Sequence, residues 1–249
     1  MIKISVVTAV YNRQQTVGQA IDSVLSQSHP LVESVVIDGS STDSTLAVLA
    51  PYRPRLGVLV SEPDQGIYDA LNKGIRHATG EVVGFLHADD IFENNEVLAK
   101  VAAAFEDPSI DAVYGDLVYV RQDNISNVIR YWKSGLFDQA DLAKGWMPPH
   151  PSFYVRRSVY KRLGGFDTRY RIAADYDTML RFLAVGKIRT AYIPEVLVRM
   201  RAGGISNRSL ATIIRKSRED IDVLRRNQVG GVMTLLHKNL SKVSQFWRR

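Results

Sequence analysis

The sequence contains no cysteine among its 249 residues. Disulfides, thiolate metal sites and cysteine nucleophiles are therefore excluded, and the composition fits a reducing compartment. No apolar run approaches the roughly 20 residues that a membrane-spanning helix needs, and we expect no signal peptide because the first residues lead directly into a strand-like stretch. The Gly-x-Gly-x-x-Gly motif is also missing, which argues against a dinucleotide-binding dehydrogenase.

Acidic residues are absent from residues 223–249, although the whole chain has 26 of them. From residue 208 onward there are ten lysines and arginines and only three acids, so the net charge of +6 comes from this tail. Apolar residues make up 45% of the chain and charged residues 23%, as in ordinary globular proteins. The nearly neutral remainder gives no indication of a nucleic-acid-binding body.

Short apolar runs alternate with amphipathic segments over the first 110 residues. We expect strands at 4–10, 34–37, 56–60 and 82–86, and helices at 16–28, 43–49, 66–78 and 94–105. The pattern then loosens, with strands expected at 112–114, 117–120 and 152–155 and helices at 158–163, 175–185 and 210–226. This alternation predicts an α/β fold with a mostly parallel sheet, helices on both faces and a helical C-terminal extension.

Polar residues follow each of the first four expected strands. In open α/β sheets, ligands bind beyond the carboxyl ends of the parallel strands. The residues at these ends are Thr8 to Asn12, Asp38, Asp64, and the pair Asp89 and Asp90. Because four such clusters would meet at one edge of the sheet, we expect a binding site there.

The pair Asp89 and Asp90 suits a hard divalent cation, which prefers oxygen ligands and accepts diphosphate oxygens as well. Such a cation would stabilise a departing nucleoside diphosphate. The alternative is that these acids cap the following helix.

Asp38 could accept a hydrogen bond from the N–H of a nucleotide base, because Ser41 and its neighbours are better capping candidates. Asp64 lies at the end of the third expected strand. Lys73, about two turns into the following helix, could contact phosphate. A solvated surface lysine is the alternative for that residue.

Asp175 and Asp177 open a helix, where one acid could cap the helix and the other could act as a base. Transfer to a hydroxyl needs a base that removes its proton. Two prolines flank His150 and could aim its imidazole at a metal, a diphosphate or an acceptor. A packing or surface histidine is the alternative.

The motifs together resemble the family 2 glycosyltransferases of the GT-A fold, in particular bacterial enzymes of surface and exopolysaccharide synthesis. The matching segments are 6–12, 36–45, 62–74, 85–90, 164–167 and 175–177, which cover residues 1 to about 200 in the order of the family. The resemblance implies a catalytic domain at 1–206, with a nucleotide-binding half at 1–110 and an acceptor half at 111–206, and a basic helical extension at 207–249.

The resemblance also implies an activity and a role for each site residue. A sugar would pass from a UDP- or GDP-sugar to an acceptor hydroxyl by direct displacement with inversion, with Mg²⁺ or Mn²⁺ as cofactor. The nucleotide would contact Thr8, Val10, Asn12, Asp38, Asp64, Lys73 and Asp89; the metal would be held by Asp90 with Asp89; and the base would be Asp175, with Asp177 as its rival.

Two motifs depart from the family pattern. The metal motif has histidine and alanine before Asp89 and Asp90 instead of Asp-x-Asp, and two alanines precede Asp175 where many relatives carry Glu-Asp. The Gln-x-x-Arg-Trp motif of processive synthases is absent, which favours one sugar per encounter.

The C-terminal tail carries apolar residues at helical spacing among basic ones. The apolar positions are Val232, Leu236, Leu240, Val243 and Trp247, and the charges come from Lys238, Lys242, Arg248 and Arg249. Such a helix could bind an anionic membrane on the cytoplasmic side, where a lipid-linked glycan acceptor would be found, or pack on the body or a second subunit. Two other functions remain open: a sugar nucleotidyltransferase and a non-catalytic, membrane-associated assembly module.

Overall fold

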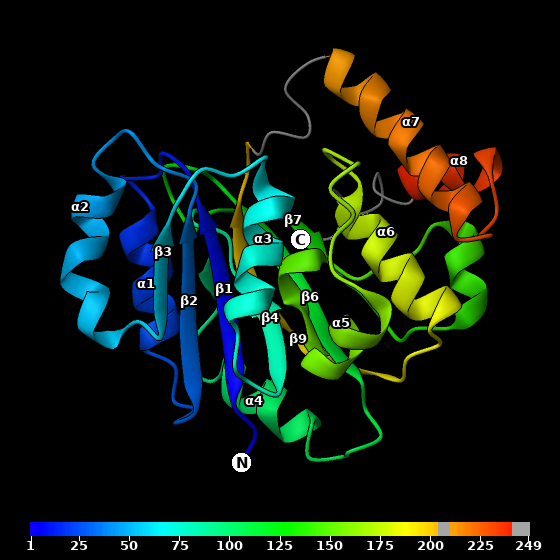
Figure 1. Cartoon of the computed structure of the whole chain (residues 1–249). Coiled ribbons are helices and arrows are strands. Elements are labelled where there is room, and N and C mark those ends of the chain that lie inside the picture. Colours follow the sequence, from blue (N-terminus) through cyan, green and yellow to red (C-terminus); the bar gives the residue numbers. More distant parts are fainter. Residues whose placement is uncertain (204–209, 241–249) are drawn as a thin grey trace.

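A mixed sheet runs through the protein (Figure 1). The computed structural model describes residues 1–203 and 210–240, and in this part the sheet has nine strands in the order β3-β2-β1-β4-β8-β6-β9-β5, with β7 paired to β6. The strands are β1 (Ile4–Val10), β2 (Val32–Asp38), β3 (Val58–Ser61), β4 (Val82–Phe85), β5 (Ile91–Phe92), β6 (Ala112–Val120), β7 (Val128–Trp132), β8 (Phe153–Arg156) and β9 (Thr190–Arg201).

The N-terminal half of the sheet is parallel, as the sequence predicts. β1 pairs with β2 and β4, and β2 pairs with β3, all in parallel register. Val10 lies opposite Asp38, and Asp38 lies opposite Ser61, so these three strands end at one level. The other half is mixed: β8 is antiparallel to β4 and β6, whereas β9 is parallel to β6.

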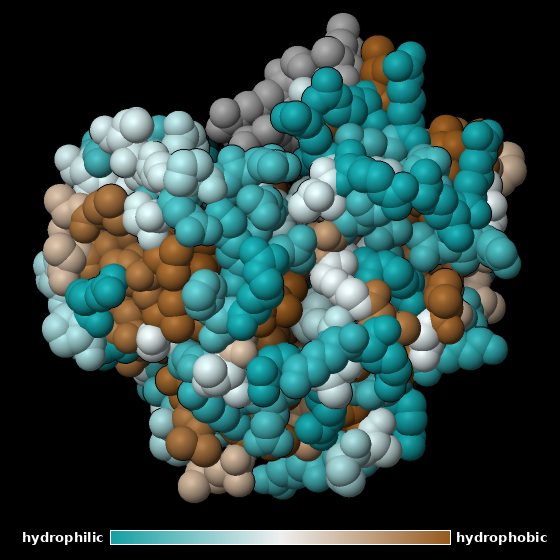
Figure 2. Space-filling model, viewed as in Figure 1, coloured by the Kyte–Doolittle hydropathy of each residue, from teal (hydrophilic) through white to brown (hydrophobic). Residues whose placement is uncertain are grey.

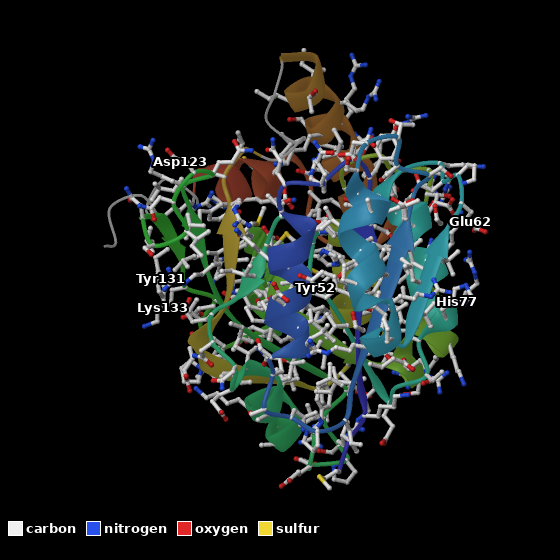
Figure 3. All side chains as sticks on the ribbon, turned by 90° about the vertical axis from the view of Figure 1, so that its left-hand side faces the viewer. Tyr52, Glu62, His77, Asp123, Tyr131 and Lys133 are labelled. Carbon is white, nitrogen blue, oxygen red and sulfur yellow. The ribbon has the colours of Figure 1, made fainter. Side chains whose placement is uncertain are left out.

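Helices cover both faces of the sheet (Figure 1). One face packs against α1 (Val17–Leu25), α2 (Thr45–Leu49) and α4 (Val97–Ala104), and the other against α3 (Ile67–His77), α5 (Arg157–Leu163) and α6 (Ala174–Leu180). Short 3₁₀ turns occupy Ala50–Arg55, Gln139–Lys144 and His150–Ser152, and a π-helical turn, Arg181–Val185, continues α6. Figure 3 looks onto α1, with Glu62 after β3 on one side and Tyr131 of β7 on the other.

β1 and β4 are buried strands, β4 wholly apolar and β1 apolar except for Ser5 and Thr8. Every residue of both strands is buried, which is typical of parallel strands covered on both faces. At Gly74 of α3 the helix approaches β1 closely, since a Cβ there would lie 2.2 Å from Cγ1 of Val7. The absence of a side chain at this position therefore sets how deeply α3 packs on the sheet.

The C-terminal extension forms two helices, α7 (Leu210–Arg226) and α8 (Val232–Leu240). α7 projects above the end of the sheet where β1 and β2 finish (Figure 1). Of the two alternatives for the tail, Lys238 follows packing on the body, because it is buried and ion-paired with Asp220 of α7 at 3.0 Å. The predictions for Val243 and Trp247 lie outside the described residues, and no helix in the described ranges is long and apolar enough to cross a membrane.

Four strands differ from the sequence prediction. The two-residue strand β5 was not expected. The two short strands expected at 112–114 and 117–120 form one strand, β6, which continues through a register shift at Gly115 and Asp116. β7 and the twelve-residue β9 were not predicted. β9 contains Pro194 and several charged residues, and much of it is only half buried, so its sequence lacks the apolar run of a central strand.

Candidate active site

The carboxyl ends of β1, β2 and β4 bring most of the predicted site residues to one rim of the sheet. Polar atoms cover this upper rim in the space-filling view (Figure 2). A pocket of about 280 Å³ opens there, with residues from the β1–α1 loop, the end of β4 and the end of β9 in its wall. The wall includes Asn12, Arg13, Asp43, Asp89 and Arg201.

Asp38 ends β2 and is completely buried. Its carboxylate accepts hydrogen bonds from the Ser41 backbone N–H at 3.0 Å, from the Ser41 hydroxyl, and from the Ser61 hydroxyl at 2.6 Å. Asp38 therefore has hydrogen-bond partners in its own turn and on the neighbouring strand β3. The carboxylate fixes the turn that follows β2, while its nucleotide-binding role stays a prediction.

Asn12, which follows β1, also holds the loop after β2. It adopts a positive φ of 51°, and its Oδ1 accepts hydrogen bonds from the backbone N–H groups of Thr42 at 2.8 Å and Asp43 at 3.3 Å. Thr8 and Val10 are buried in β1, and the Thr8 hydroxyl has no hydrogen-bond partner. These contacts join the loops after β1 and β2 into one wall of the rim.

Lys73 and Asp64 shape the loop before α3. The Lys73 ammonium donates to the Pro63 carbonyl at 2.7 Å and lies 2.8 Å from a Glu62 carboxylate oxygen, which raises the pKa of Lys73. Asp64 accepts a hydrogen bond from the Gly66 N–H at 2.8 Å. In this structure Lys73 therefore binds the loop that precedes its own helix, and its contact with phosphate stays a prediction.

The two acids after β4 have different surroundings. Asp89 is 37% exposed and faces the pocket, where the Arg13 guanidinium lies 3.9 Å from its carboxylate. Asp90 is buried; one carboxylate oxygen accepts from the Arg201 backbone N–H at 3.1 Å, and the other has no partner. Burial, and then the charge of Asp89, raise the pKa of Asp90 well above its ordinary value.

Arg13 and Arg201 were not singled out in the sequence. Arg201 ends β9 and donates to the Asp89 carbonyl, while its own backbone N–H holds Asp90. A single arginine after the first strand is a weak signal, and Arg201 lies in the sequence far from the other charged residues of the pocket wall. Only the pairing of β9 with β6 and β5 brings it to the rim.

His150 lies in an aromatic cluster beneath the rim. Its ring stacks on Phe85 with the centroids 5.0 Å apart, meets Phe166 edge-on at 5.4 Å, and lies 5.8 Å from the ring of His87. Burial, and then the neighbouring His87, lower the pKa of His150 to about 3, so its imidazole is neutral near pH 7. Nε2 of His150 has no partner.

Asp175 lies at the start of α6, half buried. Its Oδ1 accepts from the Tyr176 backbone N–H at 2.8 Å and lies 3.3 Å from the hydroxyl of Tyr68, a residue of α3 that the sequence analysis missed. The charges of Asp89 and Asp175 both act on His87, raising its pKa against the larger opposite effect of burial. His87 therefore interacts electrostatically both with an acid after β4 and with the acid that opens α6.

Asp177 is occupied by other partners. One carboxylate oxygen lies 3.1 Å from the Arg181 guanidinium, and the other accepts from the Asn227 side-chain amide at 3.0 Å. It is buried, with 6% of its surface exposed. These contacts tie α6 to its own continuation and to the end of α7.

Comparison with known proteins identifies the family. Residues 5–164 match the family model described as "Glycosyl transferase family 2". The chain is 34% identical over 209 residues to a PGL/p-HBAD biosynthesis glycosyltransferase of Mycobacterium bovis, covering 82% of this chain and 78% of that protein. It is 32% identical over 231 residues to an uncharacterized glycosyltransferase of Mycobacterium tuberculosis, covering 92% and 86%.

Solved structures share the fold. The mannosyltransferase PcManGT from Pyrobaculum calidifontis, in complex with GDP-Man and Mn²⁺, aligns with a TM-score of 0.67 at 22% identity, over 96% of this chain and 70% of that one. TarS of S. aureus, residues 1–349 in complex with UDP-GlcNAc, aligns with a TM-score of 0.67 at 19% identity, over 91% and 65%. The chain belongs to glycosyl transferase family 2, has the GT-A fold, and is a glycosyltransferase.

Proposed function

We propose that the chain transfers a sugar from a UDP- or GDP-sugar to an acceptor hydroxyl by direct displacement, with inversion at the anomeric carbon. The observation that carries this proposal is the setting of three acids: Asp89 lies in the wall of the pocket, Asp90 beside it has a carboxylate oxygen without a partner, and Asp175 opens α6 next to the Tyr68 hydroxyl. Two acids that follow β4 and a third at the start of α6 can contact the donor and the acceptor in the same complex.

A divalent cation, Mg²⁺ or Mn²⁺, fits the two acids after β4. Asp90 has a carboxylate oxygen without a partner, and Asp89 faces a polar pocket, which suits a hard cation that prefers oxygen ligands. No group of three His, Asp or Glu side chains in residues 1–203 and 210–240 is arranged to hold a metal alone. The donor diphosphate would therefore complete the ligand set, and the bound cation would neutralise charge on the leaving group.

The nucleotide would lie against the loops after β1 and β2. Asp38 and Asn12 hold these loops through the turn at Ser41 and Thr42, so they present the wall that faces the base. Arg13 and Arg201 supply positive charge beside Asp89, where the diphosphate would lie.

Asp175 is the better candidate for the base. Asp175 is half buried and its carboxylate accepts hydrogen bonds at Oδ1, whereas both carboxylate oxygens of Asp177 are filled by Arg181 and Asn227. A base must reach the acceptor proton, and only a carboxylate with unfilled acceptor positions can do so. We assign the base to Asp175 and a structural role to Asp177.

The test uses the full chain, with a panel of UDP- and GDP-sugars and Mn²⁺. Asp175→Asn should keep donor binding, measured by thermal stabilisation. It should lower both the rate of sugar transfer and the slower rate of donor hydrolysis by a factor of about 10² to 10⁴. Asp90→Ala should remove the part of donor binding that depends on Mn²⁺. Asp123→Asn, at an exposed turn between β6 and β7, is the control and should behave as wild type. Full transfer by Asp175→Asn would overturn the assignment of the base.

The acceptor is proposed to be a lipid-linked glycan of cell-surface polysaccharide synthesis, used at the cytoplasmic face of the membrane. Exposed apolar side chains on the extension support this proposal: Ile213 and Ile214 on α7 and Met233 and Leu236 on α8. Arginines on α7 lie among them. Apolar residues with basic neighbours favour an anionic lipid surface, and brown atoms mark the projecting end of α7 in Figure 2.

A further inference from the structure

Glu219 of α7 binds the backbone immediately before the proposed base. Its Oε1 accepts a hydrogen bond from the Arg171 N–H at 3.2 Å, and its Oε2 accepts from the N–H groups of Ile172 at 2.8 Å and Ala173 at 3.0 Å. Three consecutive N–H groups thus converge on one carboxylate. Hydrogen bonds to a charged acceptor are roughly twice as strong as neutral ones, so this contact holds the loop firmly.

The same loop is held from the opposite side by α3. The Tyr68 hydroxyl lies 2.6 Å from the Ile172 carbonyl oxygen and 3.3 Å from Oδ1 of Asp175. Burial, and then the charge of Asp175, raise the pKa of Tyr68 well above its ordinary value, so the hydroxyl keeps its proton and remains a donor. The backbone of Ile172 is therefore fixed by Glu219 at its N–H and by Tyr68 at its carbonyl.

The C-terminal extension also contacts the residues that follow Asp175. Lys238 of α8 lies 3.2 Å from the ring centroid of Tyr176 and pairs with Asp220, the residue next to Glu219. Asn227 donates to Asp177. Because these contacts lie on both sides of Asp175 in the sequence, α7 cannot shift without moving the segment that carries the base.

We propose that Glu219 is a positioning residue for the transfer reaction: by holding the N–H groups of residues 171–173, it sets the direction of the Asp175 carboxylate toward the acceptor. This inference rests on the proposed role of Asp175 as the base. It gives the extension a function in the chemistry itself, through a helix that lies outside the segment matched by the family model. A displacement of a base by about 1 Å can lower a rate by about 10²-fold.

The first measurement needs no substrate. Amide hydrogen exchange is compared between the wild type, Glu219→Ala and Glu219→Gln, each as the full chain. Glu219→Ala should speed exchange in the segment 171–177, whereas Glu219→Gln, which keeps an oxygen for two of the three N–H groups, should show a smaller change. Glu96→Ala, an exposed glutamate before α4, is the matched control and should leave the segment unchanged.

The second measurement is kinetic, with a nucleotide sugar that the wild type hydrolyses or transfers in the panel. Glu219→Ala should lower kcat by about 10²-fold with little change in the KM for the donor, and Glu219→Gln should recover part of the loss. In the Asp175→Asn background, Glu219→Ala should cause no further loss, because the group that it positions is already gone.

The outcomes separate this inference from the proposed function. If Asp175→Asn keeps full transfer, the assignment of the base fails whatever Glu219 does. If Asp175→Asn is inactive while Glu219→Ala keeps the wild-type kcat, the positioning role is overturned and the proposed function stands. The positioning role would also be overturned if Glu219→Ala raised the donor KM by as large a factor as it lowered kcat. The same holds if Glu219→Ala lowered kcat further in the Asp175→Asn background, since both results indicate a general structural effect.

Discussion

At the residue scale, Glu33 contributes to the stability of the fold in a way that depends on pH. It is buried, and although burial by itself raises its pKa, hydrogen bonds from Lys3, Ser5 and Thr79 lower that pKa to about 2. The folded state thus binds this proton more weakly than the unfolded chain, whose glutamate titrates near pH 4.5. The stability from Glu33 is therefore complete above that pH and is lost as the pH falls toward about 2.

Glu33→Gln should lower the free energy of unfolding at about pH 7 by up to about 3 kcal/mol, because the buried charge-assisted hydrogen bonds are weakened. The difference from the wild type should shrink steadily as the pH falls from about 5 to about 2. Urea unfolding at several pH values measures it, with the exposed Glu96→Gln as control. A difference that stays constant over this range would contradict the linkage.

Single residues also show where sequence reasoning stops. Asp89 and Asp90 could be found because paired acids after a buried strand are a local signal. His150 could not be placed, since its surroundings come from Phe85 of β4 and Phe166 of the loop before α6. Its neutral, stacked ring favours the packing alternative. The contact of Asp38 with Ser61 could not be predicted, because Ser61 lies on the neighbouring strand β3 and local capping rules do not reveal it.

At the element scale, the sequence predicts best what is periodic and uniformly buried. β1 and α7 were found with the correct ends, since the first is mostly apolar and β-branched and the second has a regular amphipathic pattern. β9 escaped because it is an interior strand of mixed burial with charged residues along it. β9 pairs with β6, which lies far from it in the sequence, so no local sequence pattern predicts that Arg201 is part of the rim.

The packing of α8 on α7 gives an element-scale prediction. Lys238 and Asp220 are both almost fully buried and lie 3.0 Å apart, so removing one partner leaves an uncompensated charge in the interior. Lys238→Met should lower the free energy of unfolding by about 3–5 kcal/mol, whereas Lys238→Met with Asp220→Leu should recover most of it. Urea unfolding of both variants decides the matter. If Lys238→Met alone lowers the free energy of unfolding no more than the double variant does, the ion pair between Lys238 and Asp220 does not stabilise the packing of α8.

At the scale of the whole molecule, the fold class, the rim and the family follow from sequence motifs, whereas the extension required the structure. The predicted basic amphipathic helix assumed that Val232, Leu236 and Lys238 act together. Instead, Lys238 faces the body while Val232 and Leu236 are exposed. Membrane attachment and support of the catalytic segment can thus use opposite sides of the same two helices.

This division makes membrane binding testable without disturbing the fold. Removing α8 would take away Lys238 and leave the buried carboxylate of Asp220 without its ion-pair partner, so substitutions at exposed positions are the sharper test. The full chain should float with vesicles that contain phosphatidylglycerol, and less with pure phosphatidylcholine. Ile213→Glu combined with Met233→Glu should lower the bound fraction at least about tenfold, because each buried apolar side chain contributes about 1.5–3 kcal/mol.

The control for flotation is Leu46→Glu, an exposed leucine of α2 on the opposite side of the molecule from α7 (Figure 1). It should bind vesicles as the wild type does. Added salt should weaken binding, since the arginines of α7 act through a screened surface potential. If Ile213→Glu with Met233→Glu binds as tightly as the wild type, or if binding ignores lipid charge, the exposed residues of α7 and α8 do not bind the membrane, and their apolar side chains need another partner.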